Sequence, residues 1–195
     1  MKFTKIPSDT FEHLTINAGI LLKGEEGFNP STNSYSETDL VGATSGGCTF
    51  AANAEYKDYG EDIDNCPKNM LELKRITSWE ATLAGTFVSI DDALCKKLVG
   101  AADNTSGHIV PRDTLKETDF EDLWLVCDYS EHNGDTNGGY VAIHLMNALN
   151  TAGFQLTSAD DEKGKFAFTF TAHYSLAAQE TVPFEIYIKK GTAEA

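Results

Sequence analysis

The chain has 195 residues, 41% of them hydrophobic and 23% charged, a composition that is ordinary for a globular protein and argues against global disorder. Its 30 acidic residues against 15 basic ones give a formal net charge of −15, which argues against tight phosphate binding because that needs clustered Lys and Arg. The N-terminus lacks the apolar core of a signal peptide, and no run approaches the roughly 20 apolar residues of a membrane span. We therefore expect a chain that is made in the cytosol and does not enter a membrane.

The chain has four widely spaced cysteines, and no two of them form a CxxC pair. They are Cys48, Cys66, Cys95 and Cys127. A zinc ribbon or a thioredoxin-type motif is therefore unsupported. Reduced, mostly buried thiols are expected in a reducing compartment. We predict no metal site and no cofactor.

Two strands are predicted before residue 60, each followed by a polar loop. Residues 11–23 and 47–59 alternate between apolar and polar side chains, as strands do. The apolar faces are Leu14, Ile16, Ala18, Ile20 and Leu22 in the first strand, and Cys48, Phe50, Ala52, Ala54 and Tyr56 in the second. The loops at 24–45 and 60–69 are rich in Gly, Ser, Thr, Asn and acidic residues, and a loop as long as the first is usually functional or disordered.

A long strand over roughly 71–90 has an apolar face and a polar face. The apolar side chains are Trp79, Ala81, Leu83 and Phe87, and the polar ones are Ser78, Glu80, Thr82 and Thr86. An apolar row backed by a Thr, Ser and Glu row is typical of a sheet with the core behind it and water in front.

The rest of the chain is predicted to hold one helix and several strands. Residues 91–99 indicate a helix with Asp91 as its N-cap and Gly100 at its C′ position. A helical turn is predicted at 116–121, with strands at 122–130, 140–157, 163–175 and 183–189; residues 140–157 also fit two strands or a helix. The expected core face of 163–175 is Phe166, Phe168, Phe170, Ala172 and Tyr174, and the last strand aligns Phe184, Ile186 and Ile188.

These elements amount to about seven strands and one flanking α-helix, which predicts a mostly β fold, a β-sandwich or partial barrel. The helices that a parallel βαβ fold needs between its strands are missing. We see no linker between two cores, so residues 1–195 are predicted to form a single domain.

No catalytic constellation is recognisable, so we predict that the protein is not an enzyme. The five histidines, at 13, 108, 132, 144 and 173, sit in no known motif, and G-x-S-x-G is absent. Residues 133–138 fit the first half of an EF-hand loop, but the twelfth position is His144 rather than a carboxylate, which favours a turn. The acidic cluster at 61–64 fits a solvated loop better than a cation site, and His108 with Arg112 fits an anion contact or a subunit contact.

Several runs carry a family likeness that spans roughly residues 40–190. The first are LVGATSGGCTFAANAEYKDYGEDIDNCPKN, LKRITSWEATLAGTFVSID and LCKKLVGAAD. The later one is IVPRDTLKETDFEDLWLVCDYSEHNGDTNGGYVAIHLMNALNTAGFQLTSADDEKGKFAFTFTAHYSLAAQETVPFEIYI. In their order along the chain and in their pattern of residue types, these runs resemble the major tail (tail tube) proteins of long-tailed bacteriophages.

This resemblance implies a structural subunit of the virion tail, made in the host cytoplasm. Such subunits close into hexameric rings that stack head to tail into a hollow tube, and neighbouring inner sheets join into one barrel around a lumen. Double-stranded DNA leaves through that lumen without specific binding. The tape measure, tail terminator and distal tail proteins are the further partners implied.

The polar strand faces are the candidates for lining the lumen, since an acidic, hydroxyl-rich wall repels DNA weakly and lets it slide. They are Ser78, Glu80, Thr82 and Thr86, with Thr169 and Thr171 as a second row. The loops at 24–45 and 60–69 are the candidates for subunit and ring contacts. The ring-contact residues expected in the second loop are Glu61, Asp62, Asp64, Asn65, Lys68 and Asn69.

Three alternatives remain at the level of sequence. The chain could serve the tube of a phage-tail-like particle. It could be a monomeric, acidic β-sandwich that binds a ligand such as a carbohydrate, or an enzyme whose site is assembled only by folding.

Overall fold

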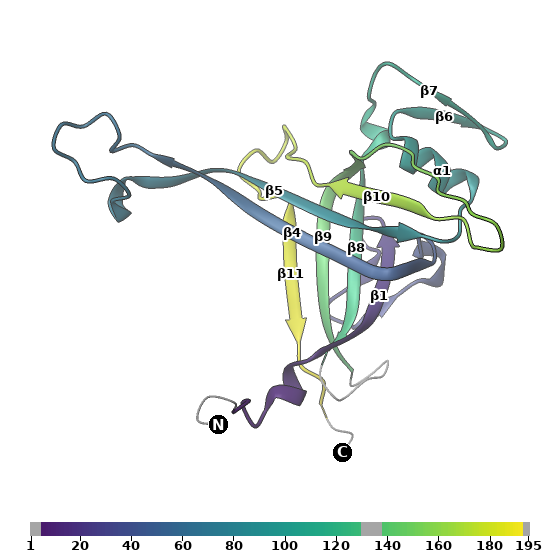
Figure 1. The fold of residues 1–195 in the computed structure, drawn as a ribbon, viewed down its shortest axis with the longest axis horizontal. Coiled ribbons are helices and arrows are strands. Elements are labelled where there is room, and N and C mark those ends of the chain that lie inside the picture. The colour runs from purple at the N-terminus through teal and green to yellow at the C-terminus, as the bar shows by residue number, and fades with distance from the viewer. Residues whose placement is uncertain (1–4, 130–137, 193–195) are drawn as a thin grey trace.

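The computed structural model describes residues 5–129 and 138–192. Two antiparallel layers make up the body, and together they form one seven-stranded sheet. The four-stranded layer has the order β1 (Thr15–Lys23), β8 (Glu121–Tyr129), β9 (Gly139–Asn150) and β11 (Phe184–Lys189). The three-stranded layer consists of β4 (Thr44–Asp58), β5 (Lys74–Phe87) and β10 (Phe166–Thr171), and it crosses in front of the other layer in Figure 1.

The layers are joined at one corner, where the end of β9 pairs with β10 through Phe170–Asn150 and Thr171–Leu149. The sheet bends there without closing into a barrel. The fold is therefore the mostly β sandwich that the sequence predicts, with a single α-helix in the part of the chain that the structure describes.

The main core lies between the two layers and explains the alternation in the sequence. Ala81, Leu83 and Phe87 of β5 are fully buried, and Phe168 of β10 stacks on Phe87 at 4.4 Å between ring centroids. Leu123 and Leu125 of β8 and Leu145 of β9 fill the core from the opposite layer. The predicted inward faces of β5 and β10 are confirmed.

A second apolar cluster covers the outer face of the four-stranded layer, and it explains why β8 is apolar on both sides. Phe28 is 3% exposed and packs against Trp124 and Tyr140. The Trp124 indole donates to Glu25 O at 3.2 Å, and the Tyr140 hydroxyl donates to Pro30 O at 2.6 Å. Part of the 24–45 loop is thus a packed flap, which contains β2 (Phe28–Asn29), β3 (Ser34–Tyr35) and the 3-10 turn η2 (Glu37–Asp39).

The helix α1 (Asp92–Val99) closes one end of the main core, as predicted. Asp91 accepts a hydrogen bond from the Leu94 N–H at 2.7 Å, and Gly100 ends the helix at φ 85°. Leu94 and Leu98 face the core, and Lys97 forms an ion pair with Glu121 of β8. Burial lowers the pKa of Lys97 to about 8.

The remaining short elements flank this body. The hairpin of β6 (Ala102–Thr105) and β7 (His108–Pro111) lies beside α1 (Figure 1). The 3-10 turns are η1 (Thr10–His13), η3 (Leu71–Leu73) and η4 (Glu117–Asp119), the last of which falls within the helical turn predicted at 116–121. None of the described helices is long and apolar enough to cross a membrane.

Four sequence expectations are corrected. Leu14 and Ile16 are 40% and 39% exposed, because the second apolar cluster covers Ile20 and Leu22 but does not extend past the bulge at 17–19 to Ile16. Residues 71–73 form η3, so the long strand is shorter than expected. The strand predicted at 140–157 ends at Asn150 and is neither two strands nor a helix.

The fourth correction concerns Tyr174, which was expected in the core. It lies beyond the end of β10 and is 40% exposed, and its hydroxyl accepts a hydrogen bond from the Trp79 N–H at 3.0 Å. The turn expected at 133–138 falls almost wholly outside the described residues.

Candidate functional site: an uncovered sheet face and a projecting arm

The outward side of the three-stranded layer is a continuous polar face. The cross-strand register places Thr82 of β5 opposite Ala51 on one side and Thr171 on the other. The partly or fully exposed side chains of this face, which we call the threonine face, are Thr49, Ala51, Asn53, Glu55, Ser78, Glu80, Thr82, Ala84, Thr86, Ala167, Thr169 and Thr171. The two rows proposed separately from the sequence are therefore brought together on one surface.

The chemistry of the threonine face is short, hydroxyl-rich and weakly acidic. Up to the Glu55–Ser78 pair its only ionisable groups are Glu55 and Glu80; beyond the bulge at Thr77, the same side of the hairpin carries Lys57 and Arg75. Ser78 Oγ donates to Glu55 Oε2 at 2.7 Å, and the hydroxyls of Thr151 and Thr171 share a hydrogen bond at 2.8 Å. Such a surface offers no clustered cations to a nucleic acid backbone.

One edge of this layer has open backbone groups. Among the described residues, β4 pairs only with β5, so its other edge is open. The outer edge of β10 is largely occupied, because Thr169 bonds to Thr151 and Asn150, Lys165 bonds to Thr157, and Phe170 and Thr171 pair with β9. In the other layer, β1 and β11 each have a single strand neighbour in the described chain. An open edge is a template for pairing with another chain, so natural proteins usually protect it.

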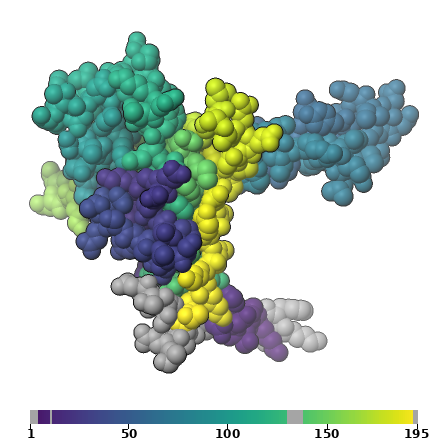
Figure 2. Space-filling view, turned by 180° about the vertical axis from the view of Figure 1, so that it is seen from behind, coloured from purple at the N-terminus to yellow at the C-terminus, as the bar shows by residue number. Residues whose placement is uncertain are grey.

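The hairpin of β4 and β5 continues far beyond the body as an arm, which we define as residues 55–78. Figure 1 shows it leaving the sandwich on one side, and Figure 2 shows that it also stands clear of the body from behind. The pairing Tyr56–Ile76, Lys57–Arg75 and Asp58–Lys74 carries the ladder out to the tip. The tip comprises residues 59–73.

The tip holds all six residues predicted for ring contacts, and every one of them is exposed. They are Glu61, Asp62, Asp64, Asn65, Lys68 and Asn69. Asn65 and Asn69 adopt positive φ values of 61° and 62°, a conformation that asparagine tolerates better than most residues. The sequence therefore placed these residues on one loop, and the structure shows that this loop is held away from the sandwich.

Asp58 fixes the shape of the tip. Its carboxylate accepts hydrogen bonds from the Gly60 N–H at 2.9 Å and from the Asn69 N–H at 2.8 Å, which ties together the two ends of the loop. These backbone hydrogen bonds lower the pKa of Asp58 below its usual range. The tip is thus an organised loop on a rigid stem.

The possible anion contact at His108 and Arg112 has a different explanation in the structure. Arg112 Nη2 donates to both carboxylate oxygens of Asp119, at 2.6 and 2.8 Å, and Arg112 Nε lies 3.0 Å from Asp103 Oδ1. The pKa of Asp119 lies below its usual range, because these bonds outweigh the effect of burial. Arg112 therefore links η4 to the hairpin of β6 and β7, and its guanidinium is already paired with carboxylates of the same chain.

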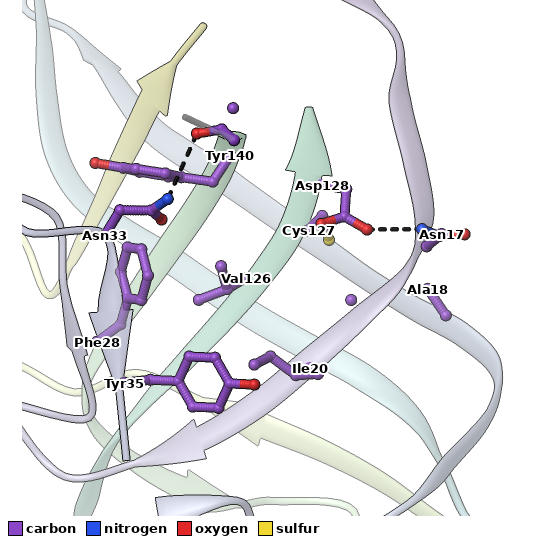
Figure 3. Close-up of a pocket in the computed structure, with 13 residues that line it drawn as sticks. Asn17, Ala18, Ile20, Phe28, Asn33, Tyr35, Val126, Cys127, Asp128 and Tyr140 are labelled. Atoms are coloured by element: carbon purple, nitrogen blue, oxygen red, sulfur yellow. Dashed lines mark hydrogen bonds between the residues drawn. The ribbon is translucent and has the colours of Figure 1, made fainter. Parts of the chain in front are cut away.

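A surface cavity of about 350 Å³ lies between the bulge of β1 and the flap on the outer face of the four-stranded layer (Figure 3). Asp128 accepts a hydrogen bond from Asn17 Nδ2 at 2.6 Å, and Asn33 Nδ2 donates to Gly138 O at 3.4 Å. Phe28, Tyr35 and Ile20 supply apolar walls. Its polar groups already bond to one another.

The contacts that histidines make in the described chain are typical of residues that stabilise a fold rather than of catalytic residues. His13 bonds to the Tyr129 hydroxyl at 2.8 Å, His144 to Asp122 at 2.9 Å and His173 to Asn147 O at 3.1 Å. None of these partners is a serine or cysteine nucleophile. The residues that the structure describes contain no group of three or more His, Cys, Asp or Glu side chains that could hold a metal ion.

All four cysteines are free and partly buried. Burial raises the pKa of the Cys48, Cys95 and Cys127 thiols. Cys66 lies in the tip of the arm.

Sequence reasoning missed two features of these surfaces. The strands predicted at 47–59 and 71–90 were joined by the loop at 60–69, but that their ends continue past the body as an arm was not predicted. The open edges cannot be read from a sequence, because pairing is a property of the assembled sheet.

No protein-family model matches the chain, and no curated protein matches it. Among solved structures, it is similar to a chain in the virion of a native gene transfer agent particle, with a TM-score of 0.42, 6% identity and coverage of 88% of this chain and 95% of that one. It is also similar to a chain from the tail of an empty gene transfer agent particle of C6 symmetry, with a TM-score of 0.42, 8% identity and coverage of 81% and 92%.

Proposed function

We propose that this chain is a non-enzymatic structural subunit of a phage tail tube, as its sequence resemblance implies. Copies assemble into hexameric rings that stack into a hollow conduit for double-stranded DNA, in the virion tail. The observation that carries the proposal is the threonine face, a continuous polar surface on a layer whose β4 edge is open. Six such layers, joined edge to edge, would make one wall that is weakly acidic on its inner side.

The edges account for ring formation. Pairing the open edge of β4 with a strand of the next copy would satisfy backbone groups that the single copy leaves to water. Joining unlike edges is a heterologous contact, which closes into a ring when the rotation allows it. Stacking of rings is a second heterologous contact, and we assign it to the tip of the arm and to the exposed part of the 24–45 loop.

The electrostatics account for the passage of DNA. Duplex DNA carries one negative charge per about 1.7 Å of axis, so a basic wall would bind it through many phosphates. A wall with Glu80, Glu55 and rows of threonine hydroxyls lets it slide. The tape measure, tail terminator and distal tail proteins would be the partners at the ends of and inside such a tube.

Electron microscopy and light scattering of the concentrated protein test the assembly. Rings or tubes support the proposal, whereas monodisperse particles of 21.2 kDa at every concentration would overturn it and favour a monomeric ligand-binding module. Deletion of residues 60–69 is expected to leave a folded subunit that no longer stacks, because the stem pairing up to Asp58–Lys74 is retained.

A labelling experiment tests the placement of the threonine face. We would introduce Thr82→Cys in a Cys66→Ser background and treat tubes with a small maleimide and with a maleimide on a bulky polymer. A lumen position is expected to react with the small reagent only, while the unassembled subunit reacts with both. Equal reaction of tubes with the bulky reagent would place this face on the outside.

A further inference from the structure

Two apolar rows run out of the core and become exposed. The first is the inward row of the β4–β5 hairpin, in which Ala54 is followed two residues later by Tyr56. Tyr56 pairs with Ile76, because a bulge at Thr77 on β5 keeps the two opposite each other. Tyr56 is 59% exposed and Ile76 is 50% exposed. We call this pair the arm stripe.

The second row lies on β11. Phe184 packs in the core edge against Trp79 and Phe50, at 5.5 and 5.7 Å between ring centroids. Ile186 and Ile188 follow on the same side of the strand, since alternate residues share a face. They are 50% and 64% exposed, and we call them the β11 stripe.

The two stripes diverge from a common corner. At that corner the hairpin crosses β11 through the Trp79–Phe184 contact, which is the point where the sandwich ends. Beyond it the arm runs to one side and β11 runs along the body (Figure 1), where it is visible as a yellow ridge in Figure 2. Inside the sandwich, the opposite layer of strands covers each of these two rows. The arm stripe and the β11 stripe lie beyond the opposite layer, so neither of them is covered.

We propose that the arm stripe of one copy packs across the β11 stripe of a second copy. This inference rests on the proposed function and names the two surfaces that meet. The contact repeats between copies the crossing that Trp79 and Phe184 make within one copy, so each stripe receives the layer that it lacks. Because an arm on one copy meets a different surface on the next, the contact is heterologous and propagates.

Charge favours another copy of this acidic chain as the occupant. The stem, which is the arm without its tip (55–58 and 74–78), carries Lys57, Lys74 and Arg75 against the carboxylates of Glu55 and Asp58. Lys74 Nζ lies 5.0 Å from the centre of the Tyr56 ring, so a cation borders the arm stripe. The remainder of the chain is strongly acidic, while β11 itself carries one acidic and one basic side chain, Glu185 and Lys189. The stem is therefore attracted to the acidic body of a second copy, and the β11 stripe does not repel it.

Charge also disfavours a nucleic acid as the occupant. The tip next to the stem carries the exposed carboxylates of Glu61, Asp62 and Asp64. A phosphate backbone that followed the stem cations would meet these groups, which repel it.

Two double variants and a control test the proposal. The arm variant is Tyr56→Thr with Ile76→Thr, and the β11 variant is Ile186→Thr with Ile188→Thr. Threonine keeps the strand propensity at these exposed positions, so both variants are expected to fold. The control is Val110→Thr on β7, which removes a comparable exposed apolar group, 46% exposed, from neither stripe.

Light scattering during concentration gives the readout, with circular dichroism to confirm folding. Wild type and the control are expected to assemble at the same concentration, and each double variant at a concentration at least about tenfold higher. A mixture of the two double variants has one intact arm stripe and one intact β11 stripe. It is therefore expected to give one-to-one pairs of twice 21.2 kDa and no longer assemblies.

The outcomes distinguish a failure of this inference from a failure of the proposed function. If wild type forms tubes and both folded double variants do so at the same concentration, this inference is wrong and the proposed function stands. If the variants assemble poorly but their mixture gives no pairs, the two stripes do not meet each other and the inference is also wrong. If wild type stays monomeric, or its arm binds duplex DNA instead of a second copy, both proposals fall.

Discussion

The two halves of the β4–β5 hairpin share one pattern of side chains and differ in what covers them. In the body, Leu83 and Phe87 are fully buried by the opposite layer and α1. In the arm, Tyr56 and Ile76 continue the same row, yet each is at least half exposed. An alternating strand therefore specifies which side is apolar, while the partner that buries that side can lie in the same chain or outside it.

Replacing a core aromatic should produce the largest loss of stability. Phe168→Ala removes a ring that is 2% exposed and stacks on Phe87, so we expect the free energy of unfolding to fall by about 3–5 kcal/mol. Urea denaturation of the unassembled protein measures it. The matched control is Leu71→Ala at the tip, where the side chain is 84% exposed and a change below about 0.5 kcal/mol is expected. Equal losses would contradict the distinction between body and arm.

The Asp122–His144 pair tests a polar contact of the body. Asp122 accepts bonds from His144 and from the Asn147 N–H at 2.9 and 2.8 Å, so Asp122→Ala should cost about 1–3 kcal/mol at pH 7. Burial alone would raise the pKa of Asp122, but these bonds outweigh it and lower the pKa below 3.8.

The sign of that shift fixes the pH dependence. A carboxyl with a lowered folded pKa stabilises the fold above about pH 4, and this contribution is lost as the pH falls through the folded value. The difference between wild type and Asp122→Ala should therefore shrink between pH 4 and pH 2. A constant difference over that range would show that the carboxylate charge does not contribute.

Removing the cap of α1 should have a smaller effect, because only one backbone donor loses its partner. Asp91→Ala is expected to lower the free energy of unfolding by about 1 kcal/mol. Asp91→Asn is the control, since an amide oxygen can still accept from the Leu94 N–H. Thermal unfolding followed by circular dichroism separates them, and an equal loss in both variants would mean that the cap is not the cause.

The smallest effect on folding is expected in the arm stem. Lys74→Gln removes a cation that lies over the Tyr56 ring, and such exposed contacts are worth about 0.5–1 kcal/mol. We expect faster amide hydrogen exchange in the stem and an unchanged unfolding midpoint for the body. A shift of the global midpoint comparable to that of Phe168→Ala would mean that arm and body form one cooperative unit.

Much of the fold could be predicted because the relevant signals are local. The rows of β5 and β10 follow from the period of two, and α1 follows from its cap and its terminal glycine. β1 was harder, since whether Ile16 is covered depends on a flap elsewhere in the chain, and a bulge at Gly19, where a Cβ would collide with Cys127, separates it from Ile20. Tyr174 was misplaced because β10 ends at Thr171 although its neighbour β5 continues to Lys74.

The candidate surfaces, like the fold, could be predicted from the sequence only in part. The polar rows of β5 and β10 were identified from the sequence, because a row of Ser, Thr and Glu behind an apolar row shows which side faces water, whereas the row of β4 was not. That Thr82 and Thr171 share one face is a matter of register between distant segments. The apolar character of Phe28 was equally visible, but nothing near it in the chain indicates that it packs on Trp124.

The sequence by itself determined the acidic charge, the β class, the apolar side of β4, β5 and β10 and the limits of α1, because composition, alternation and caps act within a few residues. Only the tertiary structure decided that β4 and β5 extend past the body, that β4 and β11 each lack a second strand neighbour in the described chain and that two apolar rows are left uncovered. Burial and pairing are relations between segments far apart in the chain, so they exist only once the layers have packed.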